Sequence, residues 1–462
     1  MESTALFSKT PPLKLFAIAA LPGSVSMLAS ALYQLLDGAF VGRLLGETAF
    51  AALNLAMPFV IINFALADLI GVGSSVHISV CLGRKNEREA YNLFTCACLM
   101  IVGAGVLVGG ILFAAAPLLI GFMGAEGDFA AMAIQYMRVY ALCSPVTTII
   151  FAVDNYLRIC GYVRGSMWLN ILMSALCAIL EFLFLGVFHW GIWAAALATC
   201  SAMMVCAVIA FLPFFRKKAM LRFCRPQFHI KMIRQIIACG SPNFLNNIAG
   251  RITSILINRI LVYMVYNCQL LKYIGEDGIS AYGVLMYVDG FVQPIMYGLC
   301  DSLQPAVGYN WGAGNYSRVR AIEKCCFTAS GVVSLLAVIV IALIPAQITK
   351  LFVNDITPEN LNLFVDALRL FCLTYIVRWF SFATQSYMLA IEKPMPASLI
   401  SVSTALVFPV LLIAALWPLG LTGIWLNFAG TAFLAAVLSL FVLLKLRREL
   451  TRPDAFPTED AG

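Results

Sequence analysis

The sequence predicts an all-α polytopic membrane protein with twelve transmembrane helices, arranged as two six-helix lobes that are related by a parallel internal repeat. Two observations carry this prediction. Hydrophobic residues make up 62% of the 462 positions and charged residues only 11%, against about 45–50% and about 25% in an ordinary soluble domain. In addition, landmarks of the first half return in the second half at a nearly constant spacing.

The repeat shows in four pairs of landmarks. These are Gly46-Glu47 with Gly275-Glu276 and Gly83 with Gly312 at a spacing of 229, Arg138 with Arg369 at 231, and Gly191-Ile192-Trp193 with Gly423-Ile424-Trp425 at 232. Such agreement is hard to obtain by chance. We therefore expect one lobe at residues 1–225 and a second at residues 226–462, with a substrate cavity where they face each other, as in many transporters.

Apolar segments long enough to cross a bilayer locate the helices. About 20 apolar residues span a membrane. On this rule the predicted spans are 15–40, 48–80, 92–120, 132–157, 166–188, 191–215, 236–265, 278–308, 322–350, 361–390, 396–418 and 421–446. Six fall in each lobe, and an even number gives both lobes the same orientation.

Positive charges set the orientation. Of the 30 Lys and Arg residues, 22 lie on one side of the proposed topology. The opposite loops are poor in Lys and Arg and carry acids such as Glu126 and Asp355. By the positive-inside rule, both termini are predicted to be cytoplasmic. The net charge of +7 is therefore an orientation signal, and no soluble domain is present to offer a nucleic acid a basic face.

Several function classes lack the residues they need. The first apolar run is long enough to be a span and lacks a cleavage pattern, so we expect no cleavable signal peptide. The fifteen Cys are scattered without CxxC pairs and are interpreted as buried hydrophobes. No metal site and no organic cofactor are expected. Because a phosphate-binding GxxxxGK[ST] loop is missing, active transport would be driven by an ion gradient.

Ionisable groups at membrane depth indicate function, because burying a charge there costs about 2.5–3.5 kcal/mol even on the lenient insertion scale. The acids at such depth are Asp37, Asp68, Asp154, Glu181, Asp289 and Asp301, and the arginines are Arg251, Arg259 and Arg378. At 100° per residue, Ser26, Ser30, Tyr33 and Asp37 fall on one face of the first helix. This stripe favours a wet cavity, although Asp37 near the helix end could instead touch interfacial water.

The second lobe carries similar stripes. Asn243, Asn247, Arg251, Ser254 and Asn258 share a face of the helix at 236–265, and Thr374, Arg378, Ser381 and Gln385 share a face at 361–390. Asp289 and Gln293 lie one turn apart in the predicted span 278–308, which falls between these two helices in the sequence. We expect Arg251 or Arg378 to neutralise Asp289 rather than to bind substrate, since an unpaired buried charge is costly.

Structural roles compete with functional ones at several positions. Asp154 and Arg158 have the i, i+4 spacing of an ion pair within one helix. Asp68 and Asp301 are equally consistent with structural partners of polar neighbours. His77 lies on an otherwise apolar helix and is interpreted as a packed histidine rather than a proton carrier.

Four segments form a familiar set. The residues from Leu32 to Gly42 read LYQLLDGAFVG, those from Leu82 to Asn86 read LGRKN, those from Gln304 to Gly314 read QPAVGYNWGAG, and Arg158 begins RICG. In this order and spacing, the chain resembles the multidrug and toxic compound extrusion (MATE) family over nearly its whole length. Each motif is weak by itself, and their order within the six-plus-six repeat carries the resemblance.

The resemblance implies a cation-coupled antiporter that exports organic, often cationic, compounds by alternating access. In many prokaryotic members the Asp of helix 1, here Asp37, works with an Asn and an Asp on helix 5. The positions that align with these two are Cys177 and Glu181, so the carboxylate is kept and the amide is lost. Asn155 or Asn170 could substitute for it. The coupling site is therefore expected in the first lobe, with H+ or Na+ as the ion.

The predicted substrate-binding residues are Tyr33, Gln34, Asp37, Asn247, Arg251, Asp289, Gln293 and Arg378. Protonation or Na+ binding at Asp37 could compete with a cationic, amphipathic organic molecule, and exchange requires only that the two ligands stabilise different states. The transporter is expected to act as a monomer in the lipid bilayer. One alternative is a lipid-linked oligosaccharide or other lipid flippase of the same superfamily, whose cavity would be rich in Arg and Lys. Another is a membrane enzyme or receptor, which would need a catalytic constellation that is not seen.

Overall fold

The computed structural model describes residues 2–124, 126–267, 275–352 and 358–450, and every regular element in these ranges is helical. The first half contains α1 (Glu2–Lys9), α2 (Pro12–Leu45), α3 (Glu47–Gly83), α4 (Glu87–Phe122), α5 (Gly127–Thr147), α6 (Ile149–Ile159), α7 (Val163–Glu181), η1 (Phe182–Val187) and α8 (Ile192–Phe215). The second contains α9 (Ile230–Asn267), α10 (Gly275–Asp301), α11 (Gln304–Gly312), α12 (Tyr316–Leu343), α13 (Pro345–Phe352), α14 (Pro358–Cys372), α15 (Thr374–Ala390), α16 (Pro394–Val402), η2 (Ser403–Val407), α17 (Phe408–Leu416), η3 (Trp417–Leu419) and α18 (Gly420–Leu450).

The chain divides into two compact units. Unit 1 comprises Met1–Phe244, Gln293–Cys326 and Leu389–Pro394, and unit 2 comprises Leu245–Val292, Phe327–Met388 and Met395–Gly462. Unit 1 thus takes in the first part of α9, the end of α10, α11 and the turn between α15 and α16. The assignment of residues 1–225 and 226–462 to two six-helix lobes stays a prediction.

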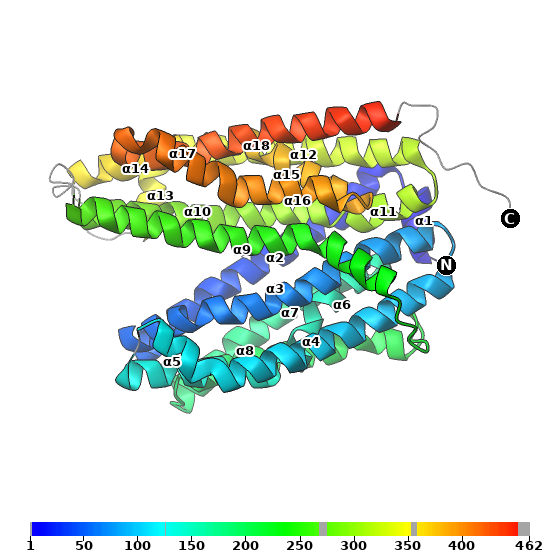
Figure 1. Cartoon of the computed structure of the whole chain (residues 1–462), viewed down its shortest axis with the longest axis horizontal. Coiled ribbons are helices and arrows are strands. Elements are labelled where there is room, and N and C mark those ends of the chain that lie inside the picture. The colour runs from blue at the N-terminus through cyan, green and yellow to red at the C-terminus, as the bar shows by residue number, and fades with distance from the viewer. Residues whose placement is uncertain (1, 125, 268–274, 353–357, 451–462) are drawn as a thin grey trace. The chain divides into compact units, whose positions relative to one another are not determined.

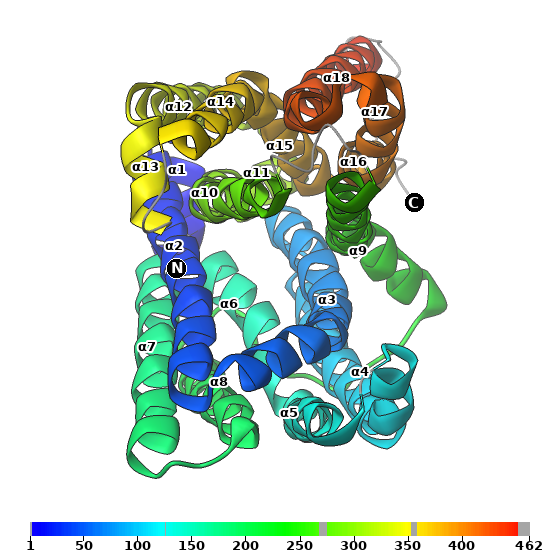
Figure 2. The same ribbon diagram turned by 90° about the vertical axis from the view of Figure 1, so that its left-hand side faces the viewer.

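In unit 1 the long helices form a closed ring. Helix α2 packs on α7, α7 on α8, α8 on α5, α5 on α4, α4 on α3, and α3 returns to α2. Figure 1 shows these helices running nearly alongside one another, and Figure 2 shows the ring end-on. The short helix α6 packs against α3 and α8. Buried apolar side chains of these helices form two clusters, whose burial stabilises unit 1.

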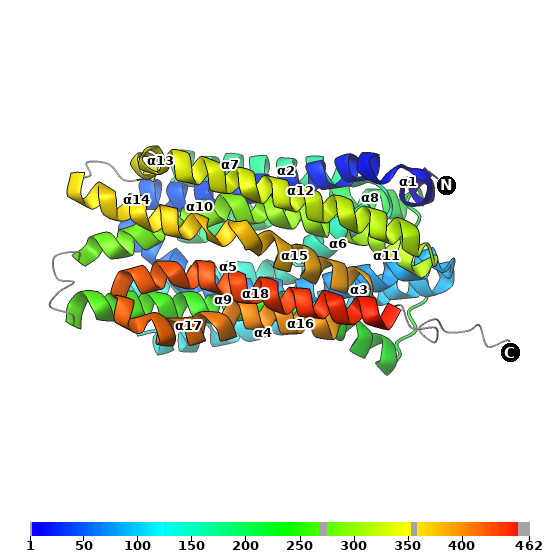
Figure 3. The ribbon, with the colours of Figure 1, turned by 90° about the horizontal axis from the view of Figure 1, so that it is seen from above.

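Unit 2 has its own apolar core. Helix α18 packs along α17 and α14, as the view in Figure 3 shows. Buried aromatic rings fill the space between these helices, with Phe371 edge-on to both Tyr375 and Phe428. Such edge-to-face pairs stabilise by about 0.5–1.5 kcal/mol beyond the burial of their area.

The helices agree with the predicted spans. Eight helical stretches of the described chain are long and apolar enough to cross a membrane, and one of them, Pro394–Arg448, covers the predicted spans 396–418 and 421–446. The remaining three predicted spans coincide with α9, with α10 and with the pair α14 and α15. The all-helical, multi-span membrane fold is therefore confirmed.

Four predicted single helices are broken, and two of them, at 278–308 and 322–350, are α10 followed by α11 and α12 followed by α13. The span at 132–157 is α5 and α6, which are separated at Thr148, three residues after Pro145. A proline within a helix removes a backbone donor and crowds the turn that precedes it, whereas this break follows Pro145, so the proline does not by itself account for it. The span at 361–390 is interrupted at Leu373, and no proline lies there to account for the interruption.

Glycines allow α3 and α9 to cross closely within unit 1. A Cβ atom on Gly73 would lie 2.0 Å from the Ile236 carbonyl oxygen, and one on Gly240 would lie 1.8 Å from the Leu69 carbonyl oxygen. No side chain fits at such separations. Small residues commonly permit this close backbone approach between membrane helices.

Candidate functional site

Three helices of unit 1 each place a polar side chain between two apolar clusters. On α2, Asp37 lies between Tyr33 of one cluster and Val41 of the other, and Glu181 of α7 lies between Cys177 and Leu185. Thr199 occupies the equivalent level of α8, next to Cys200. The three side chains are almost completely buried, with exposed fractions of 3% for Asp37, 0% for Glu181 and 1% for Thr199. They form a polar layer inside an otherwise apolar ring.

Glu181 is the centre of this layer. Its Oε1 accepts a hydrogen bond from the Thr199 hydroxyl at 3.2 Å and one from the Tyr33 hydroxyl at 3.5 Å. The Tyr33 and Thr199 hydroxyls also bond each other. Because each hydroxyl has a single proton, the bond between Tyr33 and Thr199 leaves only one of the two to donate to Glu181 Oε1 at a time, and both hydroxyls lie beside that oxygen from two different helices.

Asp37 and Glu181 are neighbours, as predicted for the coupling pair. Their carboxyl groups interact directly, across the contact between α2 and α7. Asp37 Oδ1 and Glu181 Oε2 are buried and accept no hydrogen bond in the described part of the chain. Two adjacent carboxyls with free oxygens in a closed site favour the binding of a proton or a small hard cation between them. We refer to Tyr33, Asp37, Glu181 and Thr199 as the acidic site.

The backbone changes form directly after Glu181. Helix α7 ends at this residue and continues as the π-helical turn η1. Single π turns inside longer helices occur frequently at functional sites, because they shift the register of the side chains that follow. Glu181 faces Tyr33 of α2 and Thr199 of α8, whereas the side chains of Phe182 and Val187 in η1 are exposed.

Asp154 belongs to a separate network. Arg158 Nη2 lies 2.6 Å from Asp154 Oδ2, which confirms the ion pair expected from their i, i+4 spacing. Asp154 Oδ1 accepts from the Ser166 hydroxyl at 2.5 Å and from Asn170 Nδ2 at 2.9 Å. Because every charge here has a partner, we interpret the network as structural.

The structure does not bring the two candidate amides to the acidic site. Asn170 binds Asp154, and the eleven residues that separate it from Glu181 correspond to about 16 Å along α7. Asn155 makes no side-chain hydrogen bond within the described residues. The hydroxyls of Tyr33 and Thr199 occupy the place beside Glu181 that an amide was expected to fill. Any coupling role of Asn155 or Asn170 stays a prediction.

In unit 2, Asp289 has the predicted arginine partner. Arg378 Nη1 lies 3.0 Å from Asp289 Oδ1, and the Tyr375 hydroxyl donates to the same oxygen at 2.7 Å. The guanidinium also lies over the ring of Phe382, with its carbon 5.4 Å from the ring centre. Of the two candidate arginines, Arg378 is thus the counter-charge. Arg251 is exposed and makes no ion pair within the described residues.

The other predicted substrate residues are scattered. Asn247 is exposed on α9, and Gln293 is half-buried on α10, one turn after Asp289. The Gln34 side chain lies outside the described residues. Asp68 of α3 and Asp301 at the end of α10 lie close enough for their charges to interact within unit 1. Asp301 accepts a hydrogen bond from Gln304 at 2.8 Å.

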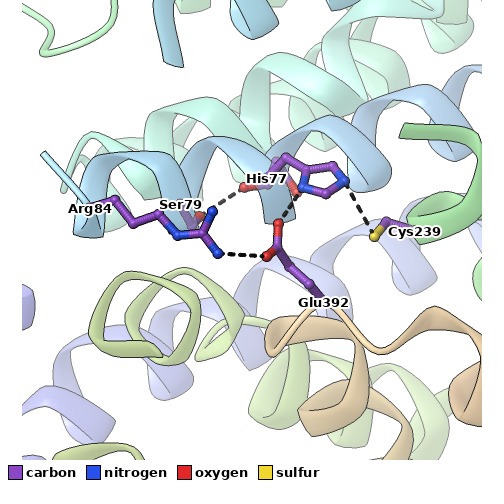
Figure 4. Close-up of polar contacts among 6 residues, drawn as sticks. His77, Ser79, Arg84, Cys239 and Glu392 are labelled. Carbon is purple, nitrogen blue, oxygen red and sulfur yellow. Dashed lines mark hydrogen bonds and ion pairs between the residues drawn. The ribbon is translucent and has the colours of Figure 1, made fainter. Parts of the chain in front are cut away.

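His77 has two polar partners, and its interpretation as a packed histidine rather than a proton carrier stays a prediction. Its Nδ1 bonds the carboxylate of Glu392, in the turn between α15 and α16, and its Nε2 lies 3.6 Å from the Cys239 sulfur on α9. Figure 4 shows the imidazole between these two partners. A histidine surrounded only by apolar side chains would have left both ring nitrogens without a partner.

Sequence reasoning missed Thr199 and Glu392. A single threonine in the apolar segment 191–215 has no periodic signal, because its role depends on the packing of α8 against α7. Glu392 is separated from His77 by 315 positions. One signal was present in the sequence: Glu392 falls 231 positions after Gly161, so the repeat replaces a turn glycine by an acid.

Comparison with known proteins identifies relatives along the whole chain. The family model MatE matches residues 22–183 and 252–414. The multidrug export protein MepA of Staphylococcus aureus (strain MSSA476) is 24% identical over 457 residues, which cover 97% of each chain. MepA of Staphylococcus haemolyticus (strain JCSC1435) is 22% identical over 454 residues, again with 97% of each covered.

Solved structures share the fold. The outward-facing conformation of a multidrug resistance MATE family transporter of the MOP superfamily matches with a TM-score of 0.88 at 22% identity, over 97% of this chain and 98% of the other. A MOP superfamily transporter from Pyrococcus furiosus, described as having a binding pocket of reverse polarity that suggests a different function, matches with a TM-score of 0.88 at 21% identity. That match covers 98% of this chain and 99% of the other.

Proposed function

The chain belongs to the MatE family, is therefore a multi-span membrane transporter and not an enzyme, and from this premise we propose that it is a cation-coupled antiporter that exports organic cations. We further propose that it works by alternating access in the bacterial plasma membrane, as a monomer with both termini in the cytoplasm. Relatives that match over almost the whole length are multidrug export proteins, which supports export of varied small molecules.

The acidic site carries the proposal. Two carboxyls buried in an apolar ring are costly unless a cation or a proton shares them. In the described chain, Asp37 Oδ1 and Glu181 Oε2 lack hydrogen-bond partners, so both can accept a ligand. A proton, Na+ or a cationic substrate would each satisfy them, and the three would compete.

Competition is sufficient for exchange. If the coupling cation and the organic cation stabilise different states of the transporter, the movement of one drives the other. Tyr33 would orient the site through its hydroxyl and offer an aromatic face to a cationic ligand. The residues proposed for coupling are thus Asp37 and Glu181, with Tyr33 and Thr199 as positioning groups.

Efflux from proteoliposomes tests the proposal. Purified protein is reconstituted, loaded with ethidium, and assayed with the H+ and Na+ gradients collapsed separately. We expect efflux to stop when one of the two gradients is removed and to persist when the other is removed. Export that continues without either gradient would rule out coupling to these cations.

Arginines on α9 favour a second candidate function, the transport of an anionic lipid such as a lipid-linked oligosaccharide. Arg251 and Arg259 are exposed, and Arg251 has no acidic partner in the described chain. A structural relative is described as having a pocket of reverse polarity. The same proteoliposomes decide between the two: a flippase would move a fluorescent lipid-linked pyrophosphate between leaflets and leave ethidium inside.

A further inference from the structure

The His77 imidazole lies inside a chain of charged contacts within unit 1. Its Nδ1 bonds one oxygen of Glu392, and the other oxygen, Oε2, lies 3.5 Å from Arg84 Nη2. The His77 and Glu392 side chains are 12% and 21% exposed, whereas that of Arg84 is 60% exposed. Glu392 therefore joins a shielded titratable ring to a solvated guanidinium (Figure 4).

The backbone at Glu392 is unusual. Its φ is 58°, in the left-handed region that favours glycine. At the corresponding position of the first repeat, 231 residues earlier, the left-handed residue is Gly161, with φ 82°. The second repeat thus keeps a carboxylate where glycine would fit without strain. Lys85, His189 and Lys217 also have a positive φ, so the strained backbone at Glu392 supports the hypothesis of a functional side chain only together with the contacts of its carboxylate.

The turn that carries Glu392 belongs to unit 1 over only a short segment of the chain. Residues Leu389–Pro394 belong to unit 1, and the chain on both sides belongs to unit 2. Within the turn, Ala390 and Ile391 are buried, and the Ala390 carbonyl lies close to Gly308 of α11. The contacts of Glu392 with His77 and Arg84 are the charged part of this attachment.

A pocket gives water access to the pair. A cavity of about 670 Å³ lies between α3, α4 and the start of α9, and both His77 and Glu392 line it. Its position beside Arg84 and Arg88 places it on the side predicted to be cytoplasmic. The other titratable or charged groups that face the pair from the surrounding elements are Cys81, Arg84, Arg88, Glu89, His229 and Cys239.

We propose that His77 and Glu392 form a second proton-binding site, distinct from the acidic site, from which the proton passes to the cytoplasm. This inference rests on the proposed function, since only a coupled transporter needs such a step. An imidazolium attracts a carboxylate, so the contact holds the turn while the ring carries its proton. When Glu392 moves away, the ring N–H bond breaks, its electron pair stays on nitrogen, and a water molecule in the pocket takes the proton.

Histidine NMR tests proton binding directly, without a transport assay. The chain has three His, so magic-angle-spinning spectra of reconstituted protein with ¹⁵N-labelled histidine rings contain few signals. The signal of His77 is assigned by its loss in His77→Gln. We expect its titration midpoint to move by about one pH unit or more in Glu392→Gln, because a carboxylate partner is lost. Glu89→Gln is the matched control, since Glu89 lines the same pocket but binds Asn86.

Two outcomes of this measurement are decisive. A midpoint that Glu392→Gln leaves unchanged overturns the proposal. If that variant does not fold, Glu392→Gly replaces it, because glycine accepts the left-handed backbone and removes the carboxylate. A midpoint that moves equally in Glu89→Gln also overturns the proposal, since the field of the whole pocket would then explain the shift.

A transport assay distinguishes a site that carries a proton during transport from an ion pair that stays intact. Ethidium efflux is measured against internal pH for the wild type and His77→Gln. We expect the pH dependence to shift in His77→Gln, and an unchanged profile together with a moved NMR midpoint would assign the pair to structure and overturn the proposal. A wild type that exports no dye under any gradient would refute the proposed function instead, and NMR would still decide whether Glu392 governs the proton on His77.

Discussion

The Thr199 hydroxyl on α8 donates to Glu181 Oε1 on α7 across 3.2 Å. This bond and the contact with the Tyr33 hydroxyl involve one carboxylate oxygen of Glu181, and within the described chain Oε2 has no hydrogen-bond partner. The two oxygens of Glu181 therefore have different surroundings. Oε1 lies beside the two hydroxyls, which orient the carboxylate, and Oε2 lies on the side of Asp37, where a coupling cation or proton would bind.

We expect Asp37→Asn to abolish coupled transport and to leave folding intact. The substitution keeps the shape of the side chain and removes its charge. A coupling free energy of about 1–3 kcal/mol corresponds to a change of about 5–150-fold in the affinity for one ligand caused by the other, and the substitution should remove this effect. Efflux rates in proteoliposomes measure the loss, and thermal unfolding in detergent checks the fold. A mutant with the wild-type rate and ion dependence would show that Asp37 does not couple.

Glu181→Gln should shift the pH profile of transport. Two adjacent carboxyls cannot both ionise freely, so they titrate as a pair, and removing one leaves the other to titrate alone. Thr199→Val keeps the side-chain volume and removes one donor to Glu181, so we expect a smaller shift of the same kind. Ser174→Ala is the control on α7, because within the described chain Ser174 bonds only the Ala29 and Asn170 carbonyl oxygens. Identical profiles for Glu181→Gln and Ser174→Ala would assign Glu181 to structure.

The features of the site that depend on neighbouring residues in the sequence were predictable, whereas those that depend on contacts between helices were not. Hydrophobic length located the helices, and helical periodicity located the face that carries Tyr33 and Asp37, because both depend on neighbours a few residues away. The contact between Asp37 and Glu181 joins two helices and was available only through the family resemblance. The partners of Glu181 on α8 depend on how three helices pack, which periodicity does not encode.

The same distinction explains His77. Its helix is apolar around it, so local pattern reasoning predicts a packed ring, and the partners Cys239 and Glu392 come from distant segments. For Asp289, the sequence narrowed the partner to two arginines by counting buried charges. Choosing Arg378 over Arg251 required the geometry of α10 against α15 in unit 2.

The ion pair of unit 2 should show coupling in a double-mutant cycle. Asp289→Asn and Arg378→Gln each leave a shielded charge without its partner, whereas the double mutant leaves none. We expect an interaction free energy of about 0.5–3 kcal/mol from thermal unfolding in detergent. The matched cycle uses Asp289→Asn with Arg251→Gln, and additivity is expected there. Additivity in both cycles would contradict the pairing and favour a role for these arginines in binding an anion.

The close crossing of α3 and α9 predicts how a substitution at Gly240 changes the stability of the protein, rather than its transport. Gly240→Ala would place a Cβ atom 1.8 Å from the Leu69 carbonyl oxygen. Backbone atoms cannot rotate away as a side chain can, so the helices must separate, and overpacking of this kind costs about 1–3 kcal/mol. Gly250→Ala is the control on the same helix, because a Cβ atom there meets no atom of the described chain within 4 Å.

The control should be neutral or stabilising, since replacing a helical glycine by alanine gains about 0.5–1 kcal/mol. Thermal unfolding of the two variants in one detergent therefore separates steric conflict from helix propensity. We expect a lower melting temperature for Gly240→Ala and an unchanged or higher one for Gly250→Ala. Equal melting temperatures would mean that α3 and α9 do not cross at Gly240 as closely as the structure places them.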